Sequence, residues 1–143
     1  HFKTITYHKY LVAKGCFKIG LYKQGLLHDM SKFSPVEFRE SVKYYTGTNS
    51  PIDNCKADKG YSEAWIHHRN NNPHHREYWV DNFDSGTIAL RMPYKYAIEM
   101  ICDYLGAGRA YNKENFSLGV VKMRKSILAM TLLVLMHLNY YGY

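Results

Sequence analysis

The sequence predicts an all-α fold in which six or seven helices form a single domain over residues 1–143. Apolar residues recur at spacings of three and four along most of the chain, which is the period of a helix with one buried face. No segment alternates polar and apolar residues for long enough to predict a strand. A chain of this length is typical of one domain and can bury a hydrophobic core.

The first predicted helix covers residues 4–24. His8 lies on the apolar stripe of this helix, which indicates that its side chain points inward. A short second element carries His28 and Asp29. The next helix, residues 35–46, has the clearest start, because "SPVE" is a capping box with proline at the first helical position. The stripe of the first helix consists of Ile5, His8, Val12, Cys16 and Ile19.

The second half of the chain is predicted to alternate loops and helices. Residues 47–60 are polar and predict a loop, and Ser62 is expected to cap a short helix that stops at Pro73. Residues 74–83 are compatible with another short helix. Two further helices are predicted, one from Pro93 to about residue 106 and a last one over residues 117–139.

The net charge and the cysteine content indicate which binding partners and which cellular compartment to expect. The formal net charge of +7 is expected to attract anions such as nucleotides, phosphorylated metabolites or nucleic acids, although most of the scattered charges are interpreted as a solvated face. Three distant cysteines without a CxxC spacing favour a reduced, cytoplasmic setting. The longest apolar run, residues 127–138, is too short to span a bilayer, so no membrane partner is expected.

Several imidazoles and carboxylates have the pattern of a metal site. They come as an inward histidine, an adjacent His-Asp pair, two histidine pairs around "RNNNP", and two carboxylates four residues apart on one helical face. Neutral imidazole nitrogens and carboxylate oxygens are the ligands that divalent transition metals take. Each residue alone is more often structural, and only the set favours a metal. The set is His8, His28, Asp29, His67, His68, His74, His75, Glu99 and Asp103.

The order His8, "HDMSK", "AWIHHRNNNPHH", Asp103 resembles the ligand order of the HD-domain metal-dependent phosphohydrolase superfamily. "HDMSK" is similar to the HD-x-G-K box of its cyclic-dinucleotide phosphodiesterase branch, with Ser31 in place of glycine. "AWIHH" is similar to the HHE box of that branch, with Arg69 in place of glutamate, and the Gly-Tyr-Pro element is absent. A closer resemblance, over roughly residues 7 to 111, is to a small bacterial and phage family of HD-like proteins with "HDxSKFSPxEF" and "HHxxxNPHHxEYW" blocks.

The resemblance implies one or two divalent ions (Mn, Fe, Co, Zn or Mg), with Asp29 between them and required for catalysis. The core ligands that it implies are His8, His28, Asp29 and Asp103. A second ion would need one histidine of each pair. Because neighbouring residues on a helix point about 100° apart, only one of each pair is expected to face the site, and His68 and His75 are favoured.

Other residues are expected to surround these ligands. His67 and His74 are expected to be further ligands or to orient a ligand. Glu99 has two possible roles: it orients a ligand, or it forms an ion pair with Arg109 or Lys95. Lys32 matches the lysine that faces phosphate in the superfamily, the alternative being a surface lysine that caps a turn. Side chains beside the histidine pairs are expected to bind anionic oxygens of a substrate, namely Arg69, Asn72 and Arg76.

The implied function is metal-dependent hydrolysis of a phosphomonoester or phosphodiester, and the expected substrate is a small nucleotide or nucleotide-derived signal. Two alternatives stay open. One is an HD-type di-iron oxygenase, which uses a similar set of ligands. The other is a non-catalytic binding protein on the same scaffold, which the arginine at position 69 slightly favours. A nucleic-acid partner is not expected, because no groove-reading motif occurs.

Residues 127–138 are apolar nearly all round a helix. A surface helix of a small domain needs only one apolar stripe. Either this helix is central to the core, or it forms the interface of a homodimer.

Overall fold

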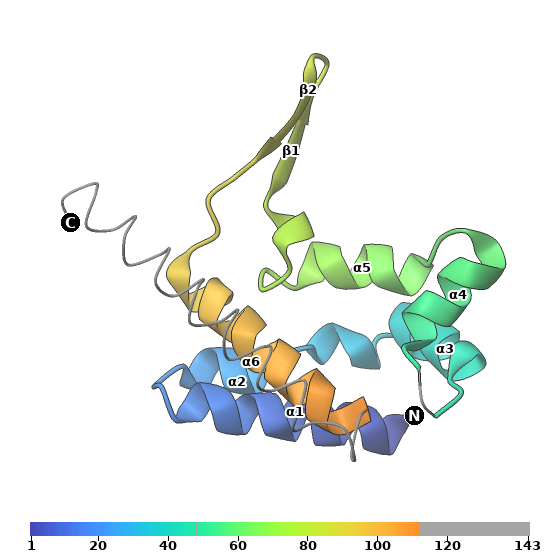
Figure 1. Cartoon of the computed structure of the whole chain (residues 1–143), viewed down its shortest axis with the longest axis vertical. Coiled ribbons are helices and arrows are strands. Elements are labelled where there is room, and N and C mark those ends of the chain that lie inside the picture. Colours follow the sequence, from blue (N-terminus) through green and yellow to red (C-terminus); the bar gives the residue numbers. More distant parts are fainter. Residues whose placement is uncertain (48, 112–143) are drawn as a thin grey trace. The chain divides into compact units, whose positions relative to one another are not determined.

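The computed structural model describes residues 1–47 and 49–111, which belong to one compact unit (Figure 1). Its described residues form six α-helices, two short 3₁₀ helices and a two-stranded sheet, so the all-α prediction is confirmed. The helix predicted over 117–139 and the dimer surface over 127–138 lie outside the described residues. In chain order, the elements are α1 (Phe2–Phe17), α2 (Tyr22–Leu27), η1 (Met30–Phe33), α3 (Pro35–Tyr44), α4 (Pro51–Lys59), α5 (Glu63–Asn71), η2 (Arg76–Tyr78), β1 (Val80–Phe83), β2 (Gly86–Ala89) and α6 (Tyr94–Tyr111).

Helix α1 packs against α6, and their contact contains the apolar core of the unit. Val12 and Cys16 of α1 meet Cys102 of α6 there, and Leu21 packs against them. The two helices approach closely at Gly106, where an added Cβ would lie 2.7 Å from Val12 Cγ2. Glycine at this position therefore allows α6 to lie directly on α1.

The first helix ends earlier than its apolar pattern predicts. Helix α1 stops at Phe17, and Gly20 adopts a left-handed conformation with φ 78° that turns the chain. Leu21 N donates to Cys16 O at 2.9 Å across this turn. Residues 22–27 then form the separate helix α2. The prediction of one helix over 4–24 is therefore wrong beyond residue 17, because a glycine tolerates the left-handed turn that other residues avoid.

Local capping chemistry starts two helices as predicted. Ser34 Oγ accepts from Glu37 N at 3.4 Å at the start of α3, and Ser62 Oγ accepts from Trp65 N at 3.0 Å at the start of α5. Glu40 of α3 ties the two helices together, because its carboxylate accepts from Ser62 Oγ at 2.6 Å and from Ala64 N at 3.1 Å. The start of α5 is thereby fixed against α3.

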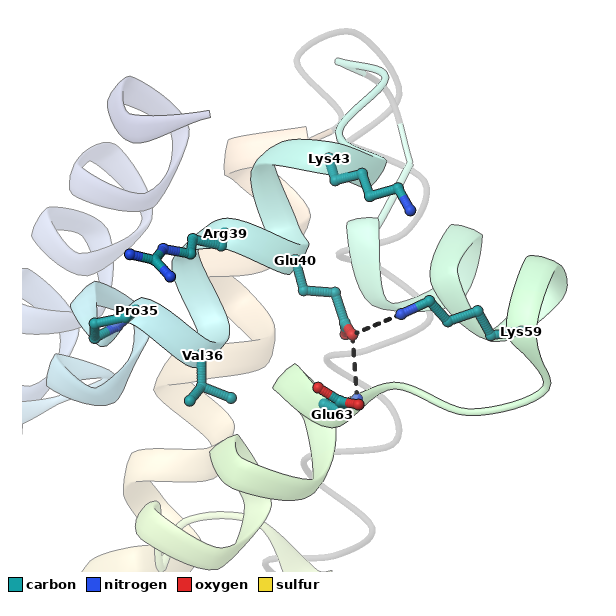
Figure 2. Close-up of a pocket in the computed structure, with 7 residues that line it drawn as sticks. All are labelled: Pro35, Val36, Arg39, Glu40, Lys43, Lys59 and Glu63. Carbon is teal, nitrogen blue, oxygen red and sulfur yellow. Dashed lines mark hydrogen bonds and ion pairs between the residues drawn. The ribbon is translucent and has the colours of Figure 1, made fainter.

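Figure 2 shows an open pocket beside this junction, between α3, α4 and the start of α5. Glu40 lies in it with Lys59 Nζ at 3.6 Å. Basic and acidic side chains alternate around the pocket, so it carries no single charge. Its lining residues are Pro35, Val36, Arg39, Glu40, Lys43, Lys59 and Glu63.

Two predicted segments have a different structure. Residues 51–59 form helix α4 instead of a loop, and they bury only Pro51 and Cys55, which is too sparse to give a helical pattern. Residues 74–83, which are compatible with a short helix, instead form a turn, the single turn η2 and strand β1. Strands β1 and β2 pair antiparallel, with Val80 opposite Ala89 and Phe83 opposite Gly86.

Every residue of the two strands is exposed, and the hairpin extends away from the helices (Figure 1). A strand that buries neither face has no reason to alternate polar and apolar residues, which explains why it was not predicted. In the described part of the chain, none of the helices has the length and apolar character that crossing a membrane requires.

Candidate metal centre

Segments that lie far apart in the sequence bring the predicted ligands to one place. Helix α1 presents His8 on its buried face, and His28 caps the C-terminus of α2 by donating its backbone N–H to Gln24 O at 2.8 Å. Pro73 follows the end of α5, and the chain turns there, with His75 N donating to Asn72 O at 3.1 Å. Buried at the centre are His8, His28, Asp29, His68, His74, Glu99 and Asp103, with His75 half-buried beside them.

The first group of possible ligands consists of His8, His28, Asp29 and Asp103. His8 Nε2 lies 3.0 Å from Asp103 Oδ1, 3.3 Å from Asp29 Oδ2 and 3.4 Å from His28 Nε2. His28 Nε2 lies 3.4 Å from Asp29 Oδ2 and 3.5 Å from Asp103 Oδ1. Ligand atoms about 2.0–2.2 Å from one ion are roughly 3.0–3.5 Å apart in octahedral or tetrahedral geometry. These separations therefore fit a shared metal ion.

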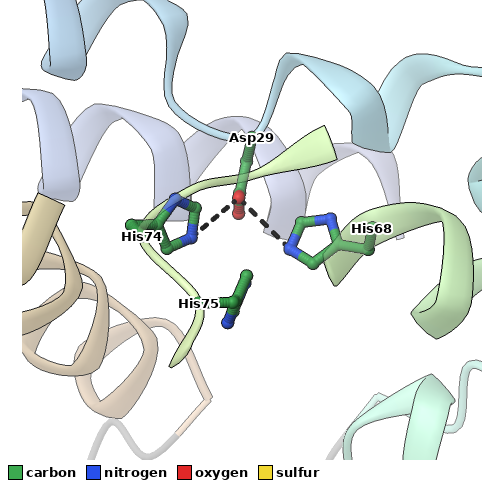
Figure 3. Close-up of side chains that lie close together, drawn as sticks. All are labelled: Asp29, His68, His74 and His75. Atoms are coloured by element: carbon green, nitrogen blue, oxygen red, sulfur yellow. Dashed lines mark ion pairs between the residues drawn. The ribbon is translucent and has the colours of Figure 1, made fainter. Parts of the chain in front are cut away.

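The second group surrounds the other oxygen of Asp29. Asp29 Oδ1 lies 3.3 Å from His68 Nε2 and 3.4 Å from His74 Nε2, and Figure 3 shows both rings pointing at this carboxylate. His75 completes the group. Asp29 therefore faces one ligand group with each of its two oxygens.

Three atoms of the second group are buried without a hydrogen bond to any described residue: Asp29 Oδ1, His74 Nε2 and His75 Nε2. Leaving a buried polar atom unpaired costs about 1–3 kcal/mol. All three atoms can donate a lone pair, so a cation would satisfy them together. This donor set of imidazoles and carboxylates fits a borderline divalent metal such as Zn²⁺ or Mn²⁺.

The backbone of Asp29 is strained. Its φ of 53° and ψ of 27° lie in the left-handed region, and no other non-glycine residue of the described ranges has a positive φ. Aspartate tolerates this region better than most residues. Lys9 Nζ donates to His28 O, and Lys32 N donates to Asp29 O at 3.1 Å, so both sides of the strained residue are held. Strain of this kind persists where the surroundings fix it, often at functional sites.

Two buried glutamates hold the histidines from behind. Glu99 Oε1 accepts from His28 Nδ1 at 2.9 Å and lies 3.3 Å from His74 Nδ1. Glu37 Oε2 accepts from His68 Nδ1 at 2.8 Å. When a carboxylate binds Nδ1–H, the lone pair of the imidazole is left on Nε2. All three Nε2 atoms then point at Asp29 with that lone pair.

The charges at the centre perturb its acids and bases. Burial alone would raise the pKa of Asp29, but the charges of His28, Lys32 and His68 hold it well below its usual value. For His28 the directions are reversed: burial alone would lower its pKa, but the charge of Asp29 and hydrogen bonds to the carboxylates raise this pKa well above its usual value. The centre therefore attracts positive charge, which either a proton or a metal ion can provide.

His75 differs from the other histidines of the centre. Burial, followed by the neighbouring His74 and His68, lowers the pKa of His75 to about 3. Its ring is therefore neutral near pH 7. Neutral imidazole is the form that binds a metal.

The histidine pairs behave differently from each other. In helix α5, His68 faces Asp29 while His67 turns to Glu37 Oε1 at 2.7 Å, as the helical spacing predicts. His74 and His75 both belong to the second ligand group. The helical argument does not apply to them, because they lie in the turn before η2.

The expected substrate-binding residues lie in different surroundings. Lys32 Nζ donates to Asp29 Oδ2 at 2.5 Å, next to both ligand groups. Asn72 is buried and donates to Ser31 Oγ at 2.6 Å and His68 O at 2.7 Å, so it supports the centre from inside. Arg69 is half-buried. Arg76 has a side chain that is 81% exposed and bonds to Glu77, which places it outside the centre.

Glu37 was missed as a site residue. Its place in the capping box already explained why a glutamate occurs at this position. In the structure, Glu37 is only 2% exposed, and its carboxylate bonds to both His67 and His68. The signal that could have found it is its place in "HDMSKFSPVEF", the same short block that contains His28, Asp29 and Lys32. An acid at a helix start can serve the helix with its backbone and a site with its side chain.

A search of curated proteins and a search of solved structures each returned no match. A family match covers nearly the whole chain: residues 1–135 fit the family described as "Family of unknown function (DUF5662)". The chain with this buried histidine and carboxylate centre therefore belongs to that family.

Proposed function

We propose that the protein is a metal-dependent phosphohydrolase of the HD type that acts on a phosphomonoester or phosphodiester. One observation carries the proposal: Asp29 faces His8 and His28 with Oδ2, and His68 and His74 with Oδ1. A carboxylate shared in this way would help to hold two ions, which would supply the chemistry of phosphoryl transfer. The net charge of +7 favours an anionic substrate. A nucleotide or nucleotide-derived signal is the substrate that we expect.

When bound, divalent ions in such a centre supply a nucleophile near neutral pH and neutralise charge on phosphoryl oxygens. The residues of the chain provide the rest. Asp29 and Asp103 bring the negative charge that retains the ions, and the buried histidines exclude bulk water from them. Lys32 has a side chain that is 27% exposed, and its ammonium group lies 2.5 Å from Asp29 Oδ2. An ammonium group at this position would bind a phosphoryl oxygen and stabilise the charge that develops on it.

The test is a screen of phosphate esters, nucleotides included, with the protein loaded with Mn²⁺, Co²⁺, Fe²⁺, Zn²⁺ or Mg²⁺. Asp29→Asn is the first variant, because asparagine also tolerates a left-handed backbone while it lacks the charge. We expect it to fold and to lose bound metal and at least about 100-fold in phosphate release. Metal-dependent hydrolysis that is equally fast in this variant would contradict the proposal.

Lys32→Met tests the substrate side of the same site. Methionine keeps much of the length of lysine without its charge. We expect KM to rise about tenfold or more while the metal content stays at the wild-type value, because a charged hydrogen bond to phosphate contributes about 1.5–3 kcal/mol. Unchanged kinetic constants would return Lys32 to a purely structural role beside Asp29.

A di-iron oxygenase is the second candidate, and the composition of the second ligand group favours it. Three imidazoles, from His68, His74 and His75, share that group with one carboxylate, and iron accepts such ligands. Anaerobic loading with Fe²⁺ followed by oxygen would separate the two functions. An oxygen-dependent change in the visible spectrum, together with no hydrolysis of any ester, would favour the oxygenase.

A further inference from the structure

The two buried glutamates behind the histidines differ in how many ligand groups they contact. Glu99 touches one histidine of each group: His28 of the first and His74 of the second. Both contacts use the same oxygen, Oε1, at 2.9 Å and 3.3 Å. Glu99 is itself only 5% exposed, so water does not compete for that oxygen.

Glu37 contacts ligands of one group only. Its Oε2 accepts from Nδ1 of His68, which faces Asp29 Oδ1 in the second group. Its Oε1 accepts from His67 at 2.7 Å, and His67 belongs to neither ligand group. The two glutamates also lie on different helices, because Glu37 is in the first turn of α3 and Glu99 is in α6.

We infer that Glu99 is a positioning residue for both ion positions, whereas Glu37 positions a ligand of the second ion position alone. This inference rests on the proposed metal centre. A hydrogen bond to Nδ1 fixes the tautomer and the ring orientation of a ligating histidine, and losing such a bond typically weakens metal binding by about 10–100-fold. Glu99 sets two rings at once through one oxygen, so it links the two ion positions through the protein in addition to Asp29.

The experiment is a titration with Co²⁺ against a competing chelator, which gives the number of ions per chain and the affinity of each. The glutamates are replaced by glutamine, which keeps the shape and removes the charge. We expect Glu99→Gln to weaken both ions by about 10–100-fold. Glu37→Gln should weaken one ion by a similar factor and leave the other at its wild-type affinity.

Glu40→Gln is the matched control. Glu40 lies on α3 like Glu37 and is half-buried, but its carboxylate bonds to Ser62 and to backbone N–H groups at the start of α5. Among the described residues, its carboxylate has no hydrogen bond or ion pair with an imidazole of the centre. Glu40→Gln should lower the stability of the fold and leave both metal affinities unchanged.

The outcomes separate this inference from the proposed function. A wild-type chain that binds no ion would overturn both. Two ions in the wild type, with Glu99→Gln affecting only one of them or Glu37→Gln affecting both alike, would overturn the inference and leave the metal centre standing. Imidazole ¹⁵N NMR of the Zn²⁺-loaded wild type gives a second test that needs no variant. The Nδ1–H protons of His28 and His74 should both be present and slow to exchange, and the absence of either would overturn the shared role of Glu99.

Discussion

Two neighbouring regions along α1 are held together in different ways. The apolar core is small and consists of Val12, Cys16 and Cys102, with Leu21 packed against it. One turn before Val12, His8 belongs to the polar centre, where imidazoles and carboxylates are buried as fully as the apolar side chains. Within the described ranges, ten polar or charged residues are buried against six hydrophobic ones, proline and glycine not counted. The polar centre is therefore a major part of the interior.

The comparison predicts that the stability of this unit depends on the positive charge bound at the centre. Apolar burial stabilises a fold under any solution condition that leaves the chain intact, at about 25 cal/mol per Å². Buried charges stabilise a fold only when other charges or hydrogen bonds compensate for their desolvation. In the centre, Lys32 compensates part of the charge of Asp29, and protons or metal ions would compensate the rest.

Metal removal should have the largest effect. A ligand present at about 1,000 times its Kd stabilises the folded state by about 4 kcal/mol. We expect extraction with a chelator to lower the free energy of unfolding by about this amount and to lower Tm accordingly. Circular dichroism during heating, with and without chelator and after adding back Mn²⁺ or Zn²⁺, measures the change. An identical Tm in all three samples would mean that the charges are already compensated within the chain.

Val12→Ala should have the next largest effect, and it should act on the core alone. Val12 is fully buried, and removing part of its side chain leaves a cavity, so we expect a loss of about 2–3 kcal/mol in the free energy of unfolding. The metal content should not change. Val42→Ala is the control, because Val42 is 48% exposed and its replacement should cost less than about 0.5 kcal/mol. Loss of metal in Val12→Ala would show that the two regions cannot be separated.

Gly106→Ala should have the smallest effect and should act on both regions. The new Cβ would lie 2.7 Å from Val12 Cγ2 and 3.5 Å from His8 Nδ1, so α6 must shift away from α1. Overpacking costs about 1–3 kcal/mol, and the better helix propensity of alanine returns up to about 1 kcal/mol. We therefore expect a net loss of about 1 kcal/mol and weaker metal binding, measured by denaturant unfolding and by Co²⁺ titration.

The double variant Val12→Ala, Gly106→Ala sharpens this test. Trimming Val12 removes the methyl group that the new Cβ meets, so the two changes should cost less together than the sum of their separate costs. Strict additivity would show that the clash is relieved elsewhere and that Gly106 is not the point where the core and the centre meet.

Features that depend on local chemistry could be predicted from the sequence. The starts of α3 and α5 follow from Ser34 and Ser62, because each serine directly precedes its helix and caps it with its side chain. The inward direction of His8 follows from its spacing with Ile5 and Val12 on one helix. These properties involve residues within one or two turns of each other, so a single sequence contains them.

Features that depend on contacts between distant segments could not be predicted. The joint inward position of His74 and His75 depends on the turn that follows α5, and the helical rule gave no guide to it. The support of His68 by Glu37 joins residues 31 positions apart. The contacts of Glu99 with His28 and His74, with which it also forms a possible ligand group, depend on the approach of α6 to these residues. In each case, the partner is set by packing and not by spacing.

The β1–β2 hairpin leaves the helices directly after the histidine turn and comes back to α6, which carries Glu99 and Asp103 (Figure 1). Its base is closed by a hydrogen bond from Leu90 N to Trp79 O at 2.8 Å, so the chain leaves and re-enters at nearly the same point. A segment closed in this way can change length or accept an inserted sequence without moving its two ends. The tip of the hairpin, around Gly86, is therefore a natural place for a fluorescent label or an affinity tag on a protein whose centre must stay intact.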